Sequence, residues 1–318
     1  MSKFKCGSSA GTAIYSACRF VKEELSFAEV MGYTGHAFRI NINANDVDVA
    51  GPTGYDWEDF FQKGLKNLGF HCKTVRTENF TPPTAEELTR ALSLIQASLD
   101  KGVPAIGWDL FTPEFGNIYG YDDEKKELMA NDPRGEGALP YEKLGRGQAN
   151  ELFVMTIEET FAIDQKTMLK GALELAVHHA NVREHLHDIP PYQNGLKGYD
   201  AWIQAFQNRN VSDFGNAYNA GVVHDARQWA AKFFEGISLS WNDDKDENKI
   251  ARLAKAASED YTEIANQLGR LVDMFPFPDG GDPNAPEQAY TAIEILNKAK
   301  QAEVRAVKTL EEMLCSLG

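Results

Sequence analysis

The chain has few cysteines, no long apolar run and no apolar leader, and each shortage excludes a class of protein. Cysteine occupies 4 of its 318 positions without any CxxC pair, too few for a disulfide framework in a chain this long. No stretch approaches the roughly 20 consecutive apolar residues that a membrane-spanning helix needs. The polar, basic N-terminus lacks the apolar segment of a secretory signal. We therefore expect a cytoplasmic protein that does not contact membranes.

Basic residues are also scarce relative to acidic ones. The chain has 32 Lys and Arg against 47 Asp and Glu, which gives a formal net charge of -15. Binding to phosphate groups requires a basic surface, so this balance argues against nucleic acid as a partner. A small-molecule ligand remains compatible with it. We interpret the acidity mainly as a source of solubility.

The first half of the chain mixes helical and strand patterns. Thr84 and Glu87 have the spacing of a capping box at the start of an amphipathic helix that Gly102 ends. Helices are predicted over about residues 10–22, 56–68 and 84–101, with a short one from Ser26, and strands over 36–42, 70–76, 103–108, 115–121, 127–130 and 152–157. Most strands follow the first helices, which favours an α+β domain over a doubly wound sheet.

The second half is predicted to be entirely helical. After about Asp164 no strand pattern remains, and apolar residues recur at steps of three and four, as in the stripe from Ile250 to Phe275. A Pro/Gly/Asp-rich loop over 276–286 separates the last two helices. Five or so helices with modest loops indicate a bundle. We therefore predict an α+β domain over residues 1–163 and a helical bundle domain over 164–318.

Two candidate nucleophiles precede the first helix. Gly7 to Gly11 matches the GxSxG elbow of serine hydrolases, but an elbow follows a core strand and only six residues come before it. We interpret this segment as a turn in which Ser8 or Ser9 caps the helix. Cys6 lies where a helix dipole would stabilise a thiolate. It would need a histidine and an orienting polar group, and the alternative is a cysteine without a special role.

Histidines offer one candidate base and one weak metal site. His36 begins a predicted strand beside Gly35, where it could face a cleft or serve as a hydrogen-bonded core residue. On the first predicted helix of the second half of the chain, Glu174, His178 and His185 share one polar face and could bind a divalent metal. The HExxH spacing is absent, so a solvated face is the favoured interpretation. We expect no metal and no cofactor.

Several short motifs resemble one known family. They are Thr12–Ala17, Gly120–Asp123 with Asn131–Pro133, and, in the helical half, Gly198–Trp202 and Gly215–Asn219. They resemble the papain-like family named for the N-terminal domain of the butirosin-biosynthesis acyltransferase BtrH. That family is similar to the bacteriocin-processing cysteine peptidases and often carries a helical companion domain. The resemblance implies a papain-like, cysteine-peptidase-like N-terminal domain followed by that companion.

The resemblance also implies site positions, and two of them depart from the family pattern. A gapless comparison places Ser9 at the nucleophilic cysteine, whereas a short gap would place Cys6 there. The catalytic histidine lies six residues before the Gly-Tyr-Asp motif, where this chain has Glu114. Asp132 matches the orienting aspartate. A carboxylate does not replace imidazole as a proton shuttle at neutral pH unless its pKa is strongly raised.

Three functional hypotheses follow. The first is an enzyme that transfers or hydrolyses acyl or amide groups on a small metabolite. Its nucleophile would be Cys6 or Ser9, its base His36 and its orienting residue Asp132, with Glu114 and Arg39 contacting the substrate. The second is a catalytically inactive relative that binds a ligand or a protein. The third is a metal-binding helical bundle.

Overall fold

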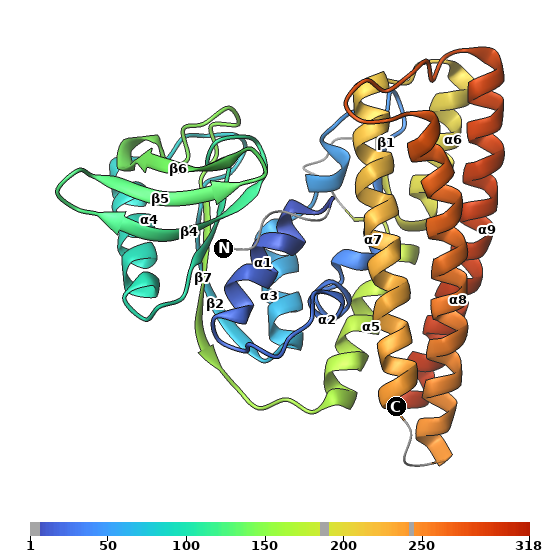
Figure 1. Ribbon diagram of the computed structural model, residues 1–318, viewed down its shortest axis with the longest axis horizontal. Helices are drawn as coiled ribbons and strands as arrows, with labels where there is room; N and C mark the ends of the chain where they lie inside the picture. The colour runs from blue at the N-terminus through green and yellow to red at the C-terminus, as the bar shows by residue number, and fades with distance from the viewer. Residues whose placement is uncertain (1–6, 185–190, 242–244) are drawn as a thin grey trace. The chain divides into compact units, whose positions relative to one another are not determined.

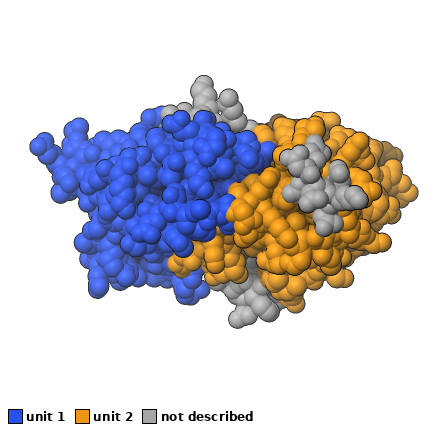
Figure 2. All heavy atoms as spheres, turned by 90° about the horizontal axis from the view of Figure 1, so that it is seen from below, with its two compact units in different colours: residues 1–30, 68–163 blue, residues 31–67, 164–318 orange. Residues whose placement is uncertain are grey.

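A computed structural model describes residues 7–184, 191–241 and 245–318, without the side chains of 245–248 (Figure 1). It is a mixed α+β protein with a sheet and a helical C-terminal part, as predicted. The chain divides into two compact units: unit 1 comprises Met1–Val30 and Leu68–Ile163, and unit 2 comprises Met31–Asn67 and Asp164–Gly318 (Figure 2). Within the described ranges, no helix combines the length and apolarity that crossing a membrane requires.

Unit 1 is built on a six-stranded antiparallel sheet with the order β2-β7-β3-β4-β5-β6. Its strands are β2 (Phe70–Arg76), β3 (Ala105–Trp108), β4 (Phe115–Asp122), β5 (Glu127–Asp132), β6 (Gly135–Pro140) and β7 (Phe153–Thr160). Helix α1 (Ser9–Arg19) packs on β3 and β4, and α4 (Ala85–Leu99) packs on β2, β3, β4 and β7. The apolar cluster under α4 includes Ile95, Ile118 and Val154, all of them buried.

Helices α1 and α4 begin at caps that the sequence indicates. The Ser8 hydroxyl accepts a hydrogen bond from the Gly11 N–H (3.1 Å). Thr84 and Glu87 form the complete capping box. Each cap satisfies backbone donors that the first helical turn cannot pair internally. These caps fix where α1 and α4 start, and the start of α1 carries a candidate nucleophile.

Unit 2 contains the long helices of the C-terminal half and the segment 31–67. Helix α2 (Phe27–Tyr33) leads into it, and its further elements are η1 (His36–Phe38), β1 (Asn41–Asn43), η2 (Gly51–Thr53), α3 (Trp57–Asn67), α5 (Gln165–Asn181), β8 (Tyr192–Asn194), α6 (Gly195–Asn208), α7 (Asp213–Ser240), α8 (Lys245–Met274) and α9 (Pro286–Leu317). The predicted stripe of α8 is confirmed, because Ile250, Tyr261, Leu268 and Phe275 are all buried.

A charged pair lies in the core of unit 2. Arg227 of α7 is fully buried, and its Nε donates to Glu303 Oε2 of α9 at 2.8 Å. The same carboxylate oxygen accepts a hydrogen bond from the Tyr199 hydroxyl (2.9 Å). Arg227 Nη1 also donates to the carbonyl oxygens of Ala37 and Arg39, at 3.0 and 3.1 Å. The pair therefore joins four segments of unit 2: the guanidinium links α7 to α9 and to residues 37–39, and the carboxylate links them to α6.

Three local predictions differ from the structure. The strand predicted over 36–42 is a 3-10 helix followed by β1, because Gly35 turns the chain with a φ of 80°. The strand β8 was not expected after residue 164; its three residues pair antiparallel with β1 and are too few to show a period. Strand β6 lies where no element was predicted, because its glycines have a low strand propensity. The boundary predicted at 163/164 stays a prediction.

Candidate functional site

The predicted substrate contact Glu114 touches the candidate nucleophile Ser9. Ser9 is the first residue of α1, and Glu114 directly precedes β4. The Ser9 hydroxyl donates a short hydrogen bond to Glu114 Oε2, and it accepts one from the Phe115 N–H at 3.2 Å. Ser9 is only 7% exposed. The start of the helix and the start of the strand thus meet at one hydroxyl group.

The loop that carries Glu114 is held by Asp132 at the end of β5. Asp132 Oδ2 accepts hydrogen bonds from the N–H groups of Phe111 and Thr112, both at 2.8 Å. Its Oδ1 accepts one from the Arg134 N–H at 2.9 Å. With three backbone donors on a buried carboxylate, Asp132 fixes the backbone of the loop. Its predicted role of orienting a side-chain base stays a prediction.

A second buried acid closes the same loop and was missed by the sequence analysis. Asp109 is 3% exposed and has a left-handed φ of 51°. Its N–H donates to the Glu114 carbonyl (3.0 Å), and its Oδ2 accepts from the Ala149 N–H (2.6 Å). Burial raises the pKa of Asp109, and the charge of Asp132 adds to the rise. An acid directly after a buried strand is the only signal the sequence gives.

Unit 1 offers no suitable histidine among its described residues for this site. Its sequence contains a single histidine, His71, which lies on β2 with its ring 4.7 Å from that of Phe161. Strands β7 and β3 separate β2 from β4. His71 therefore does not serve Ser9. Cys6, the other candidate nucleophile, lies outside the described residues.

The predicted base, His36, belongs to unit 2 and is enclosed there. Its Nδ1 lies 2.8 Å from Thr34 Oγ1 and its Nε2 lies 3.4 Å from the Tyr55 hydroxyl. The rings of Phe60 and Phe61 pack against it at 5.0 and 5.3 Å. Burial, reinforced by the positive charge of Arg39, lowers the pKa of His36 to about 3. The imidazole is therefore neutral with both nitrogens engaged, which disfavours a role in proton transfer.

Arg39, the other predicted substrate contact, is already paired inside unit 2. Its guanidinium lies over the rings of Tyr55 (4.0 Å) and Phe60 (4.5 Å) and bonds Glu184 at 2.7 Å. His179 Nδ1 lies 2.9 Å from the same carboxylate. Despite burial, the hydrogen bond from His179 and the charge of Arg39 lower the pKa of Glu184 well below its usual range. Sequence reasoning missed this group because its members are distant in the chain.

The weak metal candidates do not form a site in the part of the chain that the structure describes. Glu174 and His178 lie on α5 with exposed side chains. His185 lies outside the described residues. Among the residues described, no three His, Cys, Asp or Glu side chains come close enough to hold a metal ion.

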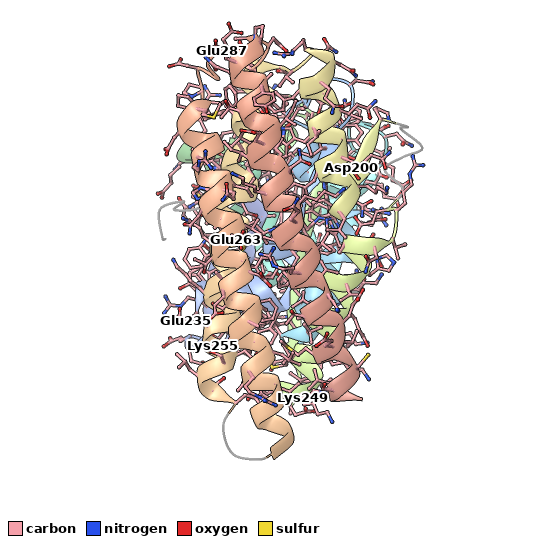
Figure 3. All side chains as sticks on the ribbon, turned by 90° about the vertical axis from the view of Figure 1, so that its right-hand side faces the viewer. Asp200, Glu235, Lys249, Lys255, Glu263 and Glu287 are labelled. Carbon is pink, nitrogen blue, oxygen red and sulfur yellow. The ribbon has the colours of Figure 1, made fainter. Side chains whose placement is uncertain are left out.

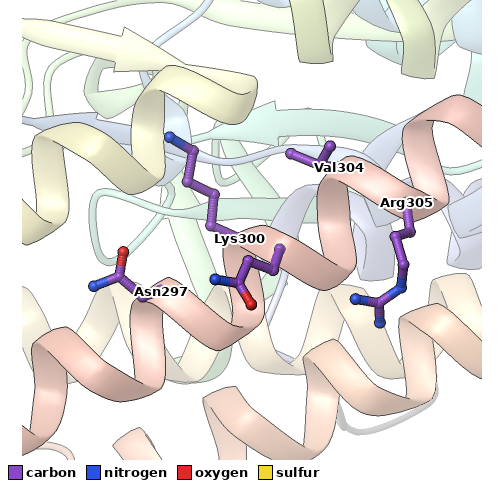
Figure 4. Close-up of a pocket in the computed structure, with 5 residues that line it drawn as sticks. Asn297, Lys300, Val304 and Arg305 are labelled. Carbon is purple, nitrogen blue, oxygen red and sulfur yellow. The ribbon is translucent and has the colours of Figure 1, made fainter.

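A shallow surface hollow of about 480 Å³ runs along α9 in unit 2. It is lined by Asn297, Lys300, Gln301, Val304 and Arg305 (Figure 4). Both cations are already neutralised, because Lys300 pairs with Asp200 (2.5 Å) and Arg305 pairs with Asp260 (2.9 Å) and Glu263 (2.5 Å). Asp200 and Glu263 are seen on this side of the bundle in Figure 3. Among the five described residues that line the hollow, neither cation is left unpaired to select a ligand.

The candidate site of unit 1 thus consists of Ser9, Glu114 and the loop that Asp109 and Asp132 hold. Of the predicted residues, the structure brings Ser9 and Glu114 into contact and places Asp132 behind them. His36 and Arg39 are engaged with partners of unit 2. No protein-family model and no curated protein matches this chain.

Proposed function

We propose that unit 1 is a papain-like domain that binds a small ligand at the start of α1 without hydrolysing it. The observation that carries the proposal is the hydrogen bond between Ser9 and Glu114. In the resembled family these two positions hold the cysteine and the histidine of a peptidase. Here a hydroxyl and a carboxylate occupy them and bond each other.

The chemistry of this pair favours binding over turnover. A carboxyl group has an ordinary pKa of about 4.3 and is a weak base once ionised at neutral pH. The Glu114 carboxyl group also lies at the N-terminus of α1, where the helix dipole favours negative charge. Ser9 and Glu114 therefore have hydrogen-bond partners in each other without a substrate. Both oxygens of Asp132 already accept hydrogen bonds from backbone N–H groups.

The same groups indicate the chemistry of a ligand. Glu114 would accept hydrogen bonds from an amino or amide group, and the Ser9 hydroxyl would then be released to donate to the ligand. A small metabolite that carries an amine or amide fits these requirements. Because the carboxylate contributes a charge-assisted bond, Glu114 would dominate the affinity.

Acyl or amide transfer is the second candidate, and one observation favours it. The Ser9 hydroxyl donates its hydrogen bond to the Glu114 carboxyl group, and Ser9 Oγ accepts one from the Phe115 N–H. This arrangement would pass the serine proton to the carboxylate as the oxygen attacks an acyl group, and the carboxyl group would return that proton to the alcohol or amine that leaves as the acyl-serine forms.

Covalent labelling tests the choice between the two. The purified chain is treated with a fluorophosphonate and with p-nitrophenyl acetate, and intact mass is measured. Binding without turnover predicts no adduct on Ser9, and the same background esterase rate for wild type, Ser9→Ala and the control Ser93→Ala on the exposed face of α4. An adduct that Ser9→Ala abolishes, and Ser93→Ala does not, would instead establish acyl transfer.

Ligand binding is tested separately with an amine and amide fragment set, followed by protein NMR. Fragments that shift the signals of α1 and the 109–114 loop are expected to lose at least tenfold in affinity in Glu114→Gln, since a charge-assisted hydrogen bond contributes about 1.5–3 kcal/mol. If no amine or amide shifts these signals, or if Glu114→Gln binds equally well, the proposed site is wrong.

A further inference from the structure

Unit 2 carries an aromatic cluster at one end of its bundle, defined by the exposed Phe214 and Phe277 and the half-buried Tyr218. Phe214 and Phe277 are 46% and 54% exposed. The Phe277 ring centroid lies 5.1 Å from that of Phe214 and 6.0 Å from that of Tyr218. Phe214 and Tyr218 come from the first turns of α7, and Phe277 comes from the loop that joins α8 to α9 at the upper end in Figure 1. Adjacent exposed rings of this size typically mark an interaction surface.

The loop that presents Phe277 is fixed to the bundle. The Gly280 N–H donates to the Pro276 carbonyl at 2.8 Å. Gly280 has a φ of 73°, and a Cβ there would come within 2.4 Å of the Asp213 backbone. Asn284 holds Val211 through two hydrogen bonds of 2.9 Å. The aromatic cluster is therefore ordered before anything binds, which lowers the entropic cost of association.

Exposed acidic residues neighbour these rings in the sequence. Asp213 adjoins Phe214 in the sequence, and Asp279 and Asp282 follow Phe277; all three are exposed. Arg209 also lies at this end, where its Nη1 donates to the Asn284 carbonyl at 3.4 Å. The local balance remains negative, as does that of the whole chain. Aromatic faces beside carboxylates attract organic cations.

The same combination occurs inside unit 2 with its cation in place. There the Arg39 guanidinium lies over the Tyr55 and Phe60 rings and pairs with the Glu184 carboxylate. A planar guanidinium can stack on a ring while its N–H groups bond a carboxylate, which an ammonium group does less well. In this internal example, two aromatic rings and one carboxylate of the chain bind a single guanidinium group.

We infer that the Phe214, Tyr218 and Phe277 cluster docks an arginine-bearing segment of a partner protein. One guanidinium stacks on the Phe277 ring, and Asp213 or Asp279 accepts its N–H groups. The exposed phenylalanines supply the apolar contact for the flanking residues of that segment. This assignment concerns unit 2 and does not depend on the site proposed in unit 1.

The test uses the full chain with terminally blocked tetra-arginine and tetra-lysine peptides, titrated by NMR and calorimetry. Phe277→Leu keeps an apolar side chain but removes the ring. It is expected to weaken tetra-arginine binding about two- to fivefold, the equivalent of one exposed cation–π contact, and to weaken tetra-lysine binding less. Phe277→Tyr should retain binding. Leu239→Ala, at a position 71% exposed near the end of α7, is the matched control and should change nothing.

Nonspecific attraction to an acidic protein has a distinct signature. If wild type, Phe277→Leu and Leu239→Ala bind both peptides with equal affinity, the peptides recognise only the net charge and the inference is overturned. Binding of an uncharged leucine peptide as tight as that of tetra-arginine would overturn the arginine assignment as well. Thermal melts of each variant identify any loss of folding, and Phe277→Tyr then provides the comparison that preserves the ring.

Discussion

Removing both members of the Arg227–Glu303 pair should destabilise unit 2 far less than the two single removals added together. Glu303→Gln deletes the negative charge that faces a fully buried guanidinium. Breaking a buried pair on one side costs about 3–5 kcal/mol, because a charge is left without compensation in a medium of low polarity. Arg227→Met should cost a similar amount, since it leaves the Glu303 carboxylate with only the Tyr199 hydroxyl.

The double variant Arg227→Met/Glu303→Leu removes both charges and leaves side chains of similar volume. It still deprives the carbonyl groups of Ala37 and Arg39 of their donor, at roughly 1 kcal/mol or more each. We therefore expect a total loss of about 2–4 kcal/mol, against about 6–10 kcal/mol for the two single losses added together. The coupling between the two residues should therefore be at least about 2 kcal/mol.

Urea unfolding of the four proteins, followed by circular dichroism and by tryptophan fluorescence, measures these differences. Two probes are needed because the chain has two units and its unfolding need not be a single transition. Losses that add within about 0.5 kcal/mol would refute the reasoning, since additivity means that the two charges do not depend on each other.

Three further predictions concern acid stability, the 109–114 loop and thiol reactivity. His36 has a folded-state pKa of about 3 against an ordinary 6.5. The neutral His36 imidazole therefore contributes fully to the free energy of unfolding above about pH 6.5, and this contribution is lost as the pH falls toward 3. The urea midpoints measured at about pH 7 and about pH 4.5 should consequently differ less in His36→Gln than in wild type. Asp132→Ala should lower the stability of unit 1 by about 2–4 kcal/mol in thermal unfolding, because three backbone donors lose a charged acceptor; an unchanged melt would show that water replaces it. Iodoacetamide at about pH 8 should modify exposed Cys315 long before buried Cys18, whose pKa burial raises. A reaction of Cys6 faster than that of Cys315 would indicate an activated thiolate and would favour the enzymatic candidate.

Local signals in the sequence predict much of the fold. The capping box at Thr84 and the apolar stripe of α8 have a strong period or a specific pair of residues, and both are confirmed. The strands predicted over 115–121 and 127–130 are likewise confirmed as the antiparallel pair β4 and β5, because turn residues separate the two segments. Such features depend on residues that are neighbours in the chain.

Pairings between distant residues were harder to predict. The resemblance aligned Ser9 and Glu114 with a catalytic pair, but only the structure shows their hydrogen bond, across 105 positions. The contact between Arg39 and Glu184 spans 145 positions and left no trace in periodicity. His36 suggested a cleft because its neighbours alternate, whereas Gly35 turns it into an aromatic core. Tertiary packing determines which distant residues contact each other, and a short stretch of sequence does not include both partners.

The division of unit 2 into two stretches of chain has a consequence for synthesis. Residues 31–67 leave the ribosome well before α5–α9, which supply the rest of their unit. The buried side chains of Phe38, Ile40 and Ile42 must therefore wait for partners encoded more than 120 positions later, while unit 1 can form in between. Long waits of this kind expose apolar surface and slow folding. Expression of residues 164–318 alone should accordingly yield an aggregating product, and supplying residues 31–67 in the same chain should rescue it.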